Sequence, residues 1–466
     1  MATTNSIFLK ARILDAMDWT PESLREALRT RPELAREKFH FWEINDDVRN
    51  RPVLLYPLMI LLCHHGEVDL NIIEEVYALY PEALRERQCR QGRAGRQREF
   101  LPLHHLLGRH NSDEIFQFVL SKYPLAAAQS YSSIFYRLPL HNEVGHLGTR
   151  RTSRIKALVD AYPNAIAIKA GAGVGYPGLP GTRTPLQVAF ELLPHNDGGH
   201  GIDTEAVAYM FDRCPRDMDE FSIGLYYGKR DVVDLDRAKL LDKILPQLKL
   251  LHCVDKFKYK HTKECSPAFT SPAFVYLMEQ LQEPNTASNL QDLEIALAKN
   301  DKVSANALEQ FLGSKTCSLV RFDLYLNNRL HGDSILECIA RGLVSNRTLK
   351  RLSITAKTGF KFSNLSYLER VFEDHNDTLE EVHIKDRSSS QRPAMCRIRY
   401  YCELNRYGRA KIRRATPRGA DLVEMLEAAG SEQTASRSSR NSCSTHAIQY
   451  GLLRESPSIW CHQELS

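Results

Sequence analysis

Two different patterns of apolar and polar residues recur along the 466-residue chain. In the first half, a proline followed by leucine-rich positions returns every 37 to 46 residues, at Pro57, Pro102, Pro139 and Pro185. A tyrosine–proline phrase keeps step with it, at Tyr80, Tyr123 and Tyr162, with weaker copies at Arg31 and Cys214. Two phrases that stay in register over several copies indicate an internal repeat.

One repeat of the first half reads as a pair of helices. Proline suits the first turn of a helix, because its missing N–H has no partner there in any case. After Pro102 the apolar residues have helical spacing, and a second stripe follows it, comprising Ile115, Phe116, Val119 and Leu120. The second helix should end before Pro124, since proline disfavours helix in the residue before it. Neither stripe is covered within one pair, so we expect neighbouring pairs to stack.

The second half has a shorter and more regular period. Leucines at Leu290, Leu319, Leu349 and Leu379 are 29 or 30 residues apart, and each opens a phrase close to L-x-x-L-x-L. Amphipathic helices are expected between these phrases. An earlier phrase at Leu245 is either an irregular first copy or a plain helix. The pattern predicts a short strand and a helix in each repeat.

These phrases resemble two known repeat families. Leu101-Pro102-Leu103-His104 and Thr184-Pro185-Leu186-Gln187-Val188-Ala189 are similar to the T-P-L-H-x-A motif of ankyrin repeats, and the later phrases resemble leucine-rich repeats of the ribonuclease-inhibitor-like type. The layout resembles ankyrin plus leucine-rich-repeat proteins of the diatom type, in which a tract like Leu404-Asn405-Arg406-x-Gly408-Arg409 follows the last repeat. The resemblance implies a fold and no defined activity.

The fold class that we predict is therefore an α plus α/β repeat solenoid. Ankyrin-like helical repeats are expected over 1–225, a connecting region over 226–285 and leucine-rich repeats over 286–387. A C-terminal cap is expected over 388–466, because the last apolar face of a repeat array would otherwise meet water. Its covering residues are predicted to be Ile448, Leu452, Leu453 and Trp460, which follow a stretch at 430–445 that is rich in serine and predicted to be disordered.

Composition narrows the class of protein without naming a function. The formal net charge of +5 is small for this length, so charge alone does not indicate a nucleic-acid binder. The 11 cysteines contain no C-x-x-C pair and do not form a dense disulfide framework. We expect no secretory signal and no membrane span, since the apolar run 53–63 is too short. A cytoplasmic or nuclear protein is expected.

Two stretches are candidates for enzymatic or metal chemistry. The glycine-rich stretch Gly171–Gly181 lacks the Walker spacing and is interpreted as a loop. His252, Cys253, His261 and Cys265 are zinc-capable, but their spacing is loose for a structural site. No serine-hydrolase, zincin or kinase motif occurs. We expect a non-enzymatic protein without cofactor or metal, and an enzyme or metal protein of unrecognised type stays an alternative.

Two arginine runs are candidates for binding acidic partners. The first extends from Arg85 to Arg98 and includes the predicted contact residues Arg90, Arg93, Arg96 and Arg98. The second extends from Arg406 to Arg418, close to Tyr400, Tyr401 and Tyr407. Guanidinium groups bind carboxylates and phosphates, and basic runs beside aromatic residues can hold nucleic acid. A nucleic-acid-associated regulator using arginine-rich loops is thus one alternative, and solvated loops are another.

The predicted strands suggest a second candidate surface. In L-x-x-L-x-L the polar positions should face away from the core, so parallel neighbours would place Asp292, Arg321, Arg351 and Glu381 in one row. The next row would hold Glu294, Asp323, Ser353 and His383. The first row is either satisfied by its own ion pairs or open to a partner. The main hypothesis is a protein–protein interaction scaffold whose contact residues are the four arginines of the first run with Asp292, Arg321, Asp323, Arg351, Glu381 and His383.

Overall fold

The computed structural model divides into two compact units, Met1–Pro215 and Arg216–Ser466. It describes residues 13–14, 20–42, 52–63, 68–91, 97–107, 112–130, 138–145, 152–170, 183–191, 204–223, 232–253, 268–284, 289–299, 301–326, 332–356, 365–385 and 392–406.

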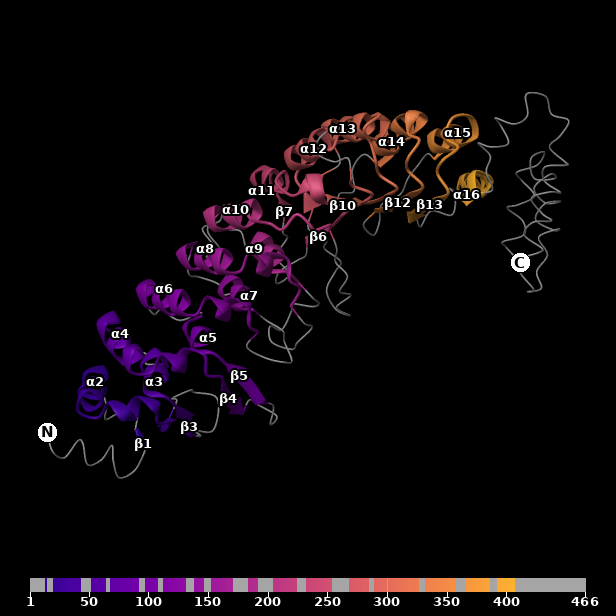
Figure 1. Ribbon diagram of the computed structural model, residues 1–466. Helices are drawn as coiled ribbons and strands as arrows, with labels where there is room; N and C mark the ends of the chain where they lie inside the picture. Colours follow the sequence, from indigo (N-terminus) through magenta and orange to yellow (C-terminus); the bar gives the residue numbers. More distant parts are fainter. Residues whose placement is uncertain are drawn as a thin grey trace, which may run out of the picture. The chain divides into compact units, whose positions relative to one another are not determined.

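Helix pairs build the first unit (Figure 1). Four short helices begin at the recurring prolines: α3 (Pro57–Cys63), α5 (Pro102–Leu106), α7 (Pro139–Gly145) and α9 (Pro185–Glu191). The longer helices are α2 (Pro21–Thr30), α4 (Leu70–Leu79), α6 (Asp113–Lys122), α8 (Thr152–Ala161) and α10 (Thr204–Asp212). Each longer helix packs against the next longer helix along the chain. Among the short helices, α3 packs on α5, and α7 packs on α9. The apolar stripes are therefore buried between successive pairs.

The tyrosine–proline phrases end the longer helices as predicted. α6 stops at Lys122, and Pro124–Ala128 then forms a 3₁₀ helix. The same turn recurs at Pro32–Arg36, Pro81–Leu84 and Pro163–Ala167. Since φ of proline is compatible with a 3₁₀ turn, each proline ends one helix and begins a tighter turn.

The first unit is not purely helical, which corrects the expectation for residues 1–225. Strands β1 (Ile13–Leu14), β2 (Phe39–Trp42) and β3 (Pro52–Leu55) form a small sheet, and β4 (Gln88–Gln91) pairs antiparallel with β5 (Gln97–Phe100). Residues 88–91 carry no apolar alternation, so only the backbone pairing with β5 shows that they form a strand.

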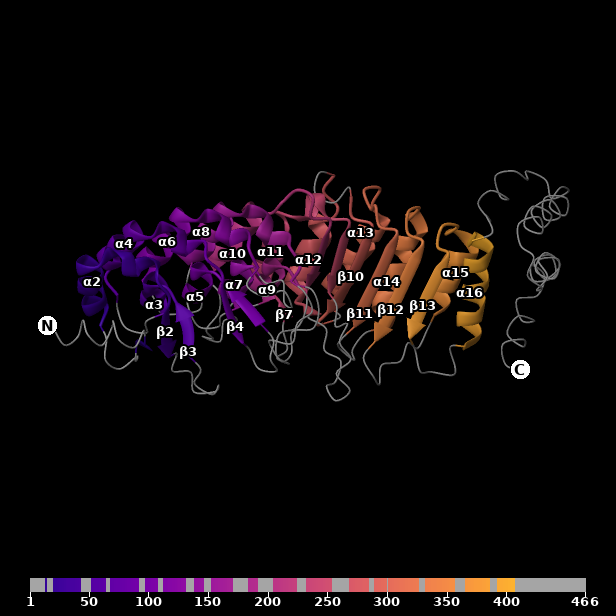
Figure 2. The same cartoon turned by 60° about the horizontal axis from the view of Figure 1, so that its bottom comes forward.

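A parallel sheet with helices on one face forms the second unit (Figure 2). Its strands lie in the order β13-β12-β11-β10-β8-β6, and off this path β9 pairs with β10 and β7 pairs with β9. The strands are β6 (Glu220–Ile223), β7 (Val232–Val233), β8 (Leu250–Cys253), β9 (Ala268–Phe269), β10 (Asp292–Leu297), β11 (Arg321–Leu326), β12 (Arg351–Ala356) and β13 (Glu381–Lys385). The helices are α11 (Leu235–Leu241), α12 (Ser271–Gln280), α13 (Lys302–Gly313), α14 (Gly332–Ser345), α15 (Ser366–Asp374) and α16 (Arg392–Arg406), each packed on the next.

The sheet extends further toward the N-terminus than the sequence suggested. β6 pairs in parallel with β8, so residues 220–223 belong to the second unit and not to the helical repeats expected up to 225. The phrase at Leu245 begins a 3₁₀ turn, Leu245–Gln247, and leads into β8, which pairs with β10. It is therefore not a plain helix. The region 226–285 supplies strands and helices to the sheet.

Buried asparagines connect successive strand–helix repeats. Asn346 lies three residues before Leu349, and its Oδ1 accepts the backbone N–H groups of Thr348 and Leu349 at 3.1 and 2.9 Å. Its Nδ2 donates to the carbonyl of Leu312 in the preceding repeat, at 2.8 Å. Asn376 repeats this arrangement with Thr378 and Leu379 and donates to Leu343 and Asn346. These side chains satisfy backbone groups that the turns would leave unpaired.

Helix α16 covers the C-terminal side of the last described repeat. It packs on α15 and β13, and buries Ile398, Tyr401 and Cys402. Asn405 donates from Nδ2 to the carbonyls of Asn376 and Leu379. The residues predicted to supply the cap, from Ile448 to Trp460, and the stretch 430–445 lie outside the described residues.

Removal of one asparagine side chain tests how far these contacts stabilise the second unit. Asn376 is fully buried, and Asn376→Ala would leave two N–H groups and two carbonyls without that partner. Each unsatisfied buried group costs about 1–3 kcal/mol, so we expect a loss of about 3 kcal/mol or more in urea unfolding. Asn289→Ala is the matched control, because the exposed Asn289 donates only to Pro246. Equal small losses in both variants would contradict this role.

A buried histidine, His104, makes the first unit sensitive to acid. The Nδ1 of His104 accepts the N–H of Leu101 at 2.9 Å, so Nε2 carries the hydrogen and donates to Gln129 O at 3.0 Å. Burial lowers the pKa of His104 to about 4 from its ordinary 6.5. As the pH falls, His104 is therefore protonated in the unfolded chain before it is protonated in the folded chain. Its contribution to the free energy of unfolding is fully present above pH 6.5 and is lost as the pH falls toward 4.

His104→Gln should reduce this pH dependence while the fold is kept. At the corresponding position Gln187 already accepts the N–H of Thr184 with its Oε1, at 2.9 Å. We expect the free energy of unfolding of the variant, followed by circular dichroism in urea, to fall less steeply between pH 6.5 and 4 than that of the wild type. Identical slopes would show that His104 does not titrate in this window.

Candidate interaction surface

Alternate residues of β10 to β13 turn away from the helices and form a polar layer. Their neighbours along each strand, such as Leu293, Phe322 and Leu352, are buried. Period-two alternation places every second side chain on the same side of a sheet. We call this layer the polar strand face, defined by Asp292, Glu294, Arg321, Asp323, Tyr325, Arg351, Ser353, Thr355, Glu381 and His383.

Both predicted rows are formed. The strand register pairs Asp292 with Arg321, Arg321 with Arg351, and Arg351 with Glu381. The second row runs through Glu294, Asp323, Ser353 and His383, and β8 extends it with His252 beside Glu294. The parallel ladder thus brings together residues that are 29 to 30 positions apart in the chain.

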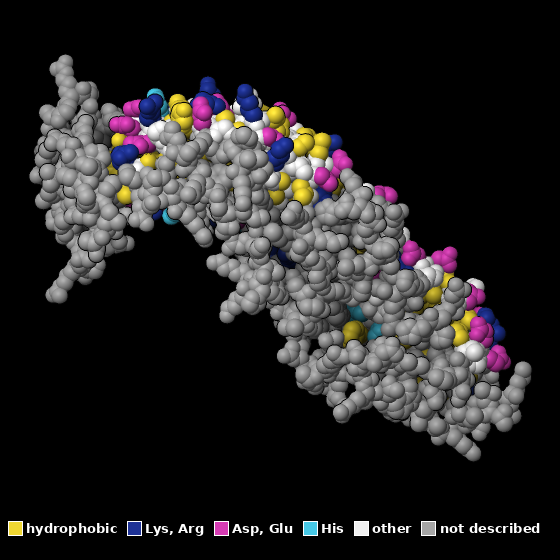
Figure 3. Space-filling view, turned by 180° about the vertical axis from the view of Figure 1, so that it is seen from behind, with side chains coloured by type: hydrophobic (Ala, Val, Ile, Leu, Met, Phe, Trp, Pro, Cys, Tyr) yellow, Lys and Arg dark blue, Asp and Glu magenta, His cyan; other side chains and the backbone are white. Residues whose placement is uncertain are grey.

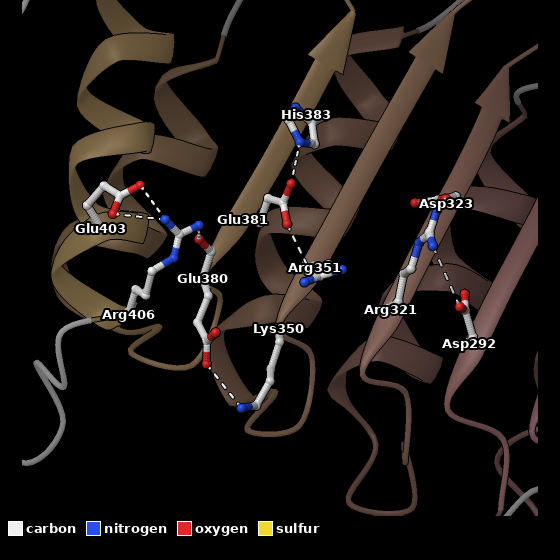
Figure 4. A network of polar contacts seen from close by, with 10 residues as sticks. All are labelled: Asp292, Arg321, Asp323, Lys350, Arg351, Glu380, Glu381, His383, Glu403 and Arg406. Atoms are coloured by element: carbon white, nitrogen blue, oxygen red, sulfur yellow. Dashed lines mark hydrogen bonds and ion pairs between the residues drawn. The ribbon is translucent and has the colours of Figure 1, made fainter. Parts of the chain in front are cut away.

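Both central arginines have carboxylate partners (Figure 4). Arg321 donates from Nε and Nη2 to Asp323 Oδ2, at 3.1 and 2.6 Å, and its Nη1 lies 3.8 Å from Asp292 Oδ2. Arg351 Nε lies 3.1 Å from Glu381 Oε2 on the neighbouring strand. The two arginines therefore pair in opposite directions along the row.

Histidine completes the charge network at β13. His383 Nε2 lies 2.6 Å from Glu381 Oε1. This contact, followed by the charges of His383 and Arg351, lowers the pKa of Glu381, so that the carboxylate is held in its charged form. Next to it, Lys350 pairs with Glu380 at 3.1 Å and Arg406 with Glu403 at 2.8 Å. On the β12–β13 part of the face, Glu381 thus has both Arg351 and His383 as partners, and two separate ion pairs lie beside this group.

The β10–β11 part of the face is less hydrated. Burial raises the pKa of Glu294, against the opposing effect of His252. Burial also raises the pKa of Tyr325, together with the charge of Glu294 and a hydrogen bond to it. Sequence reasoning did not assign Tyr325 to the surface, although its position in the alternating phrase, two residues after Asp323, could have shown it.

The outer helical layer has a different charge pattern. In Figure 3 basic and acidic side chains are interspersed over the described residues of the visible face. Arg341 reaches back from α14 to Glu309 on α13 at 2.8 Å, and Arg397 on α16 pairs with Glu369 on α15. Exposed pairs of this kind contribute little individually. This layer resembles an ordinary solvated surface.

The first arginine run lies partly on a β-hairpin, which corrects its interpretation as a loop. Arg90 on β4 is directly opposite Arg98 on β5. The base of the hairpin is held by Arg87, whose Nη1 lies 2.8 Å from Glu99 Oε2 and whose Nη2 donates to Gln129 at 2.9 Å. Arg93 and Arg96 lie outside the described residues, as does the second run beyond Arg406.

Of the zinc-capable residues and the glycine-rich stretch, only a part lies in the described residues. His252 lies on β8, with Nε2 3.7 Å from Asp292 Oδ1. His261, Cys265 and the glycine-rich stretch 171–181 are outside the described residues. Within the described ranges, no group of three or more His, Cys, Asp or Glu side chains is arranged to hold a metal ion. Nor does any helix there have the length and apolarity needed to cross a membrane.

Comparison with known proteins adds little to this geometry. No protein-family model matches the chain, and no curated protein matches it. Among solved structures, a chain described as Leiomodin-1 Actin-Binding Site 2 (ABS2) is similar over 39% of this chain and 94% of its own length, with 19% sequence identity and a TM-score of 0.26. A likeness this distant carries no argument about fold or function.

Proposed function

We propose that this chain is a non-enzymatic protein-interaction scaffold with ankyrin-like helix pairs followed by a short leucine-rich-repeat array. The proposed binding surface is the polar strand face. Solenoid repeats commonly use extended surfaces of this kind for recognition. The partners are one or more proteins, and the proposed location is the cytoplasm or the nucleus.

One observation carries the proposal. All-parallel sheets are usually covered on both faces, and their strands are then apolar on both sides. In this sheet the face away from the helices is polar, and the Arg321, Arg351 and His383 side chains are 45%, 63% and 61% exposed. A rigid, buried backbone thus presents charged side chains in fixed rows, which is suited to specific recognition.

The proposal predicts that a single charge reversal on the face removes partners. Tagged full-length protein would be used for affinity capture and quantitative mass spectrometry from native extracts. We expect Arg351→Glu to reduce the recovery of specific partners at least about tenfold, since like charges across an interface cost several kcal/mol. Arg370→Glu, an exposed position on α15 in the helical layer, is the matched control. If wild type and Arg351→Glu recover the same partners in equal amounts, the face is not the binding surface.

A second candidate function is nucleic-acid binding by the hairpin of β4 and β5. It is favoured by the register of Arg90 and Arg98, because like charges directly opposite each other destabilise a strand pair unless an anion lies nearby. The sequence from Arg87 to Arg98 contains no acidic residue. Phosphate groups of a nucleic acid would supply the missing negative charge.

Salt dependence tests this second function. Affinity for random-sequence RNA and duplex DNA would be measured by fluorescence anisotropy over a series of salt concentrations. We expect log K to fall linearly with log salt, and the slope to become shallower by about 2 in the double variant Arg90→Gln, Arg98→Gln. Failure to bind either nucleic acid at low salt would exclude this function.

A further inference from the structure

Two like charges lie side by side at the centre of the polar strand face. Arg321 and Arg351 are register partners on neighbouring strands, which places their backbones about 4.8 Å apart. Carboxylates lie only on the outer strands of this row, Asp292 on β10 and Glu381 on β13. Read across the strands, the row has the charge order negative, positive, positive, negative. The two arginines in the middle of the row therefore have the carboxylates of the row only on their outer sides, at Asp292 and Glu381.

Arg351 is the most exposed side chain in the row. Its Nε lies 3.1 Å from Glu381 Oε2, and the side chain is 63% exposed. Among the described residues, none accepts a hydrogen bond from its two terminal nitrogens. Arg321 already uses Nε and Nη2 on Asp323. A planar guanidinium with free terminal nitrogens is suited to a carboxylate, which it can bind with two parallel hydrogen bonds.

The surrounding carboxylates restrict what can bind there. Asp292, Glu294, Asp323 and Glu381 all lie within the face, and they would repel a continuous polyanion such as nucleic acid. A protein segment with acidic residues at its centre and basic residues on either side matches all four positions of the row. Its carboxylates would lie at Arg321 and Arg351, and its basic groups at Asp292 and Glu381.

The spacing of the row points to a helical segment. Neighbouring strands are about 4.8 Å apart, and side chains three or four residues apart on a helix have Cβ atoms about 5–6 Å apart. We infer that the polar strand face binds a partner helix that crosses the strands and carries the charge order positive, negative, negative, positive at this spacing. This inference rests on the proposed function and names the chemistry of its partner.

Two alanine-based helical peptides of identical composition provide the test. One carries the order Lys-Glu-Glu-Lys and the other Glu-Lys-Lys-Glu at three- or four-residue spacing, and circular dichroism would confirm equal helicity. Binding to the purified full chain would be measured by fluorescence anisotropy at low salt. Exposed ion pairs contribute about 0.2–1 kcal/mol each, so four matched against four mismatched contacts should give at least about tenfold tighter binding of Lys-Glu-Glu-Lys. Equal affinity for the two peptides would overturn the inference.

A charge-swapped variant separates recognition from a folding defect. Arg351→Glu combined with Glu381→Arg keeps the ion pair between β12 and β13 but changes the row to negative, positive, negative, positive. We expect this variant to prefer a third peptide of the same composition, with the order Lys-Glu-Lys-Glu, whereas Arg370→Glu should keep the wild-type preference. An unchanged preference in the swapped variant would contradict the inference, as would displacement of the Lys-Glu-Glu-Lys peptide by an oligonucleotide.

The outcome can be distinguished from failure of the proposed function. If affinity capture depends on Arg351 but the peptides show no preference for charge order, the face binds proteins and only the partner chemistry is wrong. If capture does not depend on Arg351 and the peptides show no preference, both proposals fail.

Discussion

Burial of an apolar stripe against the next repeat is the constraint on which the rest of this structure depends. In the first unit, Leu103 and Leu106 of the short helix α5 are buried, and α5 packs against α3 and α6. In the second unit, Leu293, Phe322 and Leu352 occupy matching register positions on successive strands, beneath the helices. A one-residue slip in the register would turn these side chains to the opposite face. The apolar side of the sheet therefore determines the arrangement of the polar side.

This coupling explains how charges of the same sign come to lie next to each other. Arg321 and Arg351 share a row because Phe322 and Leu352 beside them share the core. The guanidinium group of Arg321 is paired with Asp323 and lies near Asp292. The guanidinium group of Arg351 is paired with Glu381, on the opposite side of the row. The asparagines that join successive repeats, Asn346 and Asn376, add hydrogen bonds that hold the turns at the beginning of β12 and β13. The charged rows are thus arranged by a backbone that has little freedom to relax.

Many helices and strands could be predicted from the sequence alone, but the pairing of strands could be predicted only in part. Proline placed the beginnings of α5, α7 and α9, and the leucine period placed β10 to β13. The strands β4 and β5 were missed because Gln88–Gln91 has no apolar alternation, and β6 was missed because four residues give too short a pattern. The connecting role of Asn346 and Asn376 was also missed, although both lie three residues before the leucine that opens a phrase.

By itself, the sequence determined the period of each repeat, the side of each strand that is apolar and the order of charges in the row from Asp292 to Glu381. These properties are local or follow from periodicity, and periodicity can be found in a sequence before any contact is known. Only the tertiary structure decided which carboxylate each arginine contacts, that Arg351 keeps unoccupied donors among the described residues, and that Arg90 lies opposite Arg98. Side-chain pairing depends on distances of a few ångströms between residues far apart in the chain, and such distances exist only after the chain has folded.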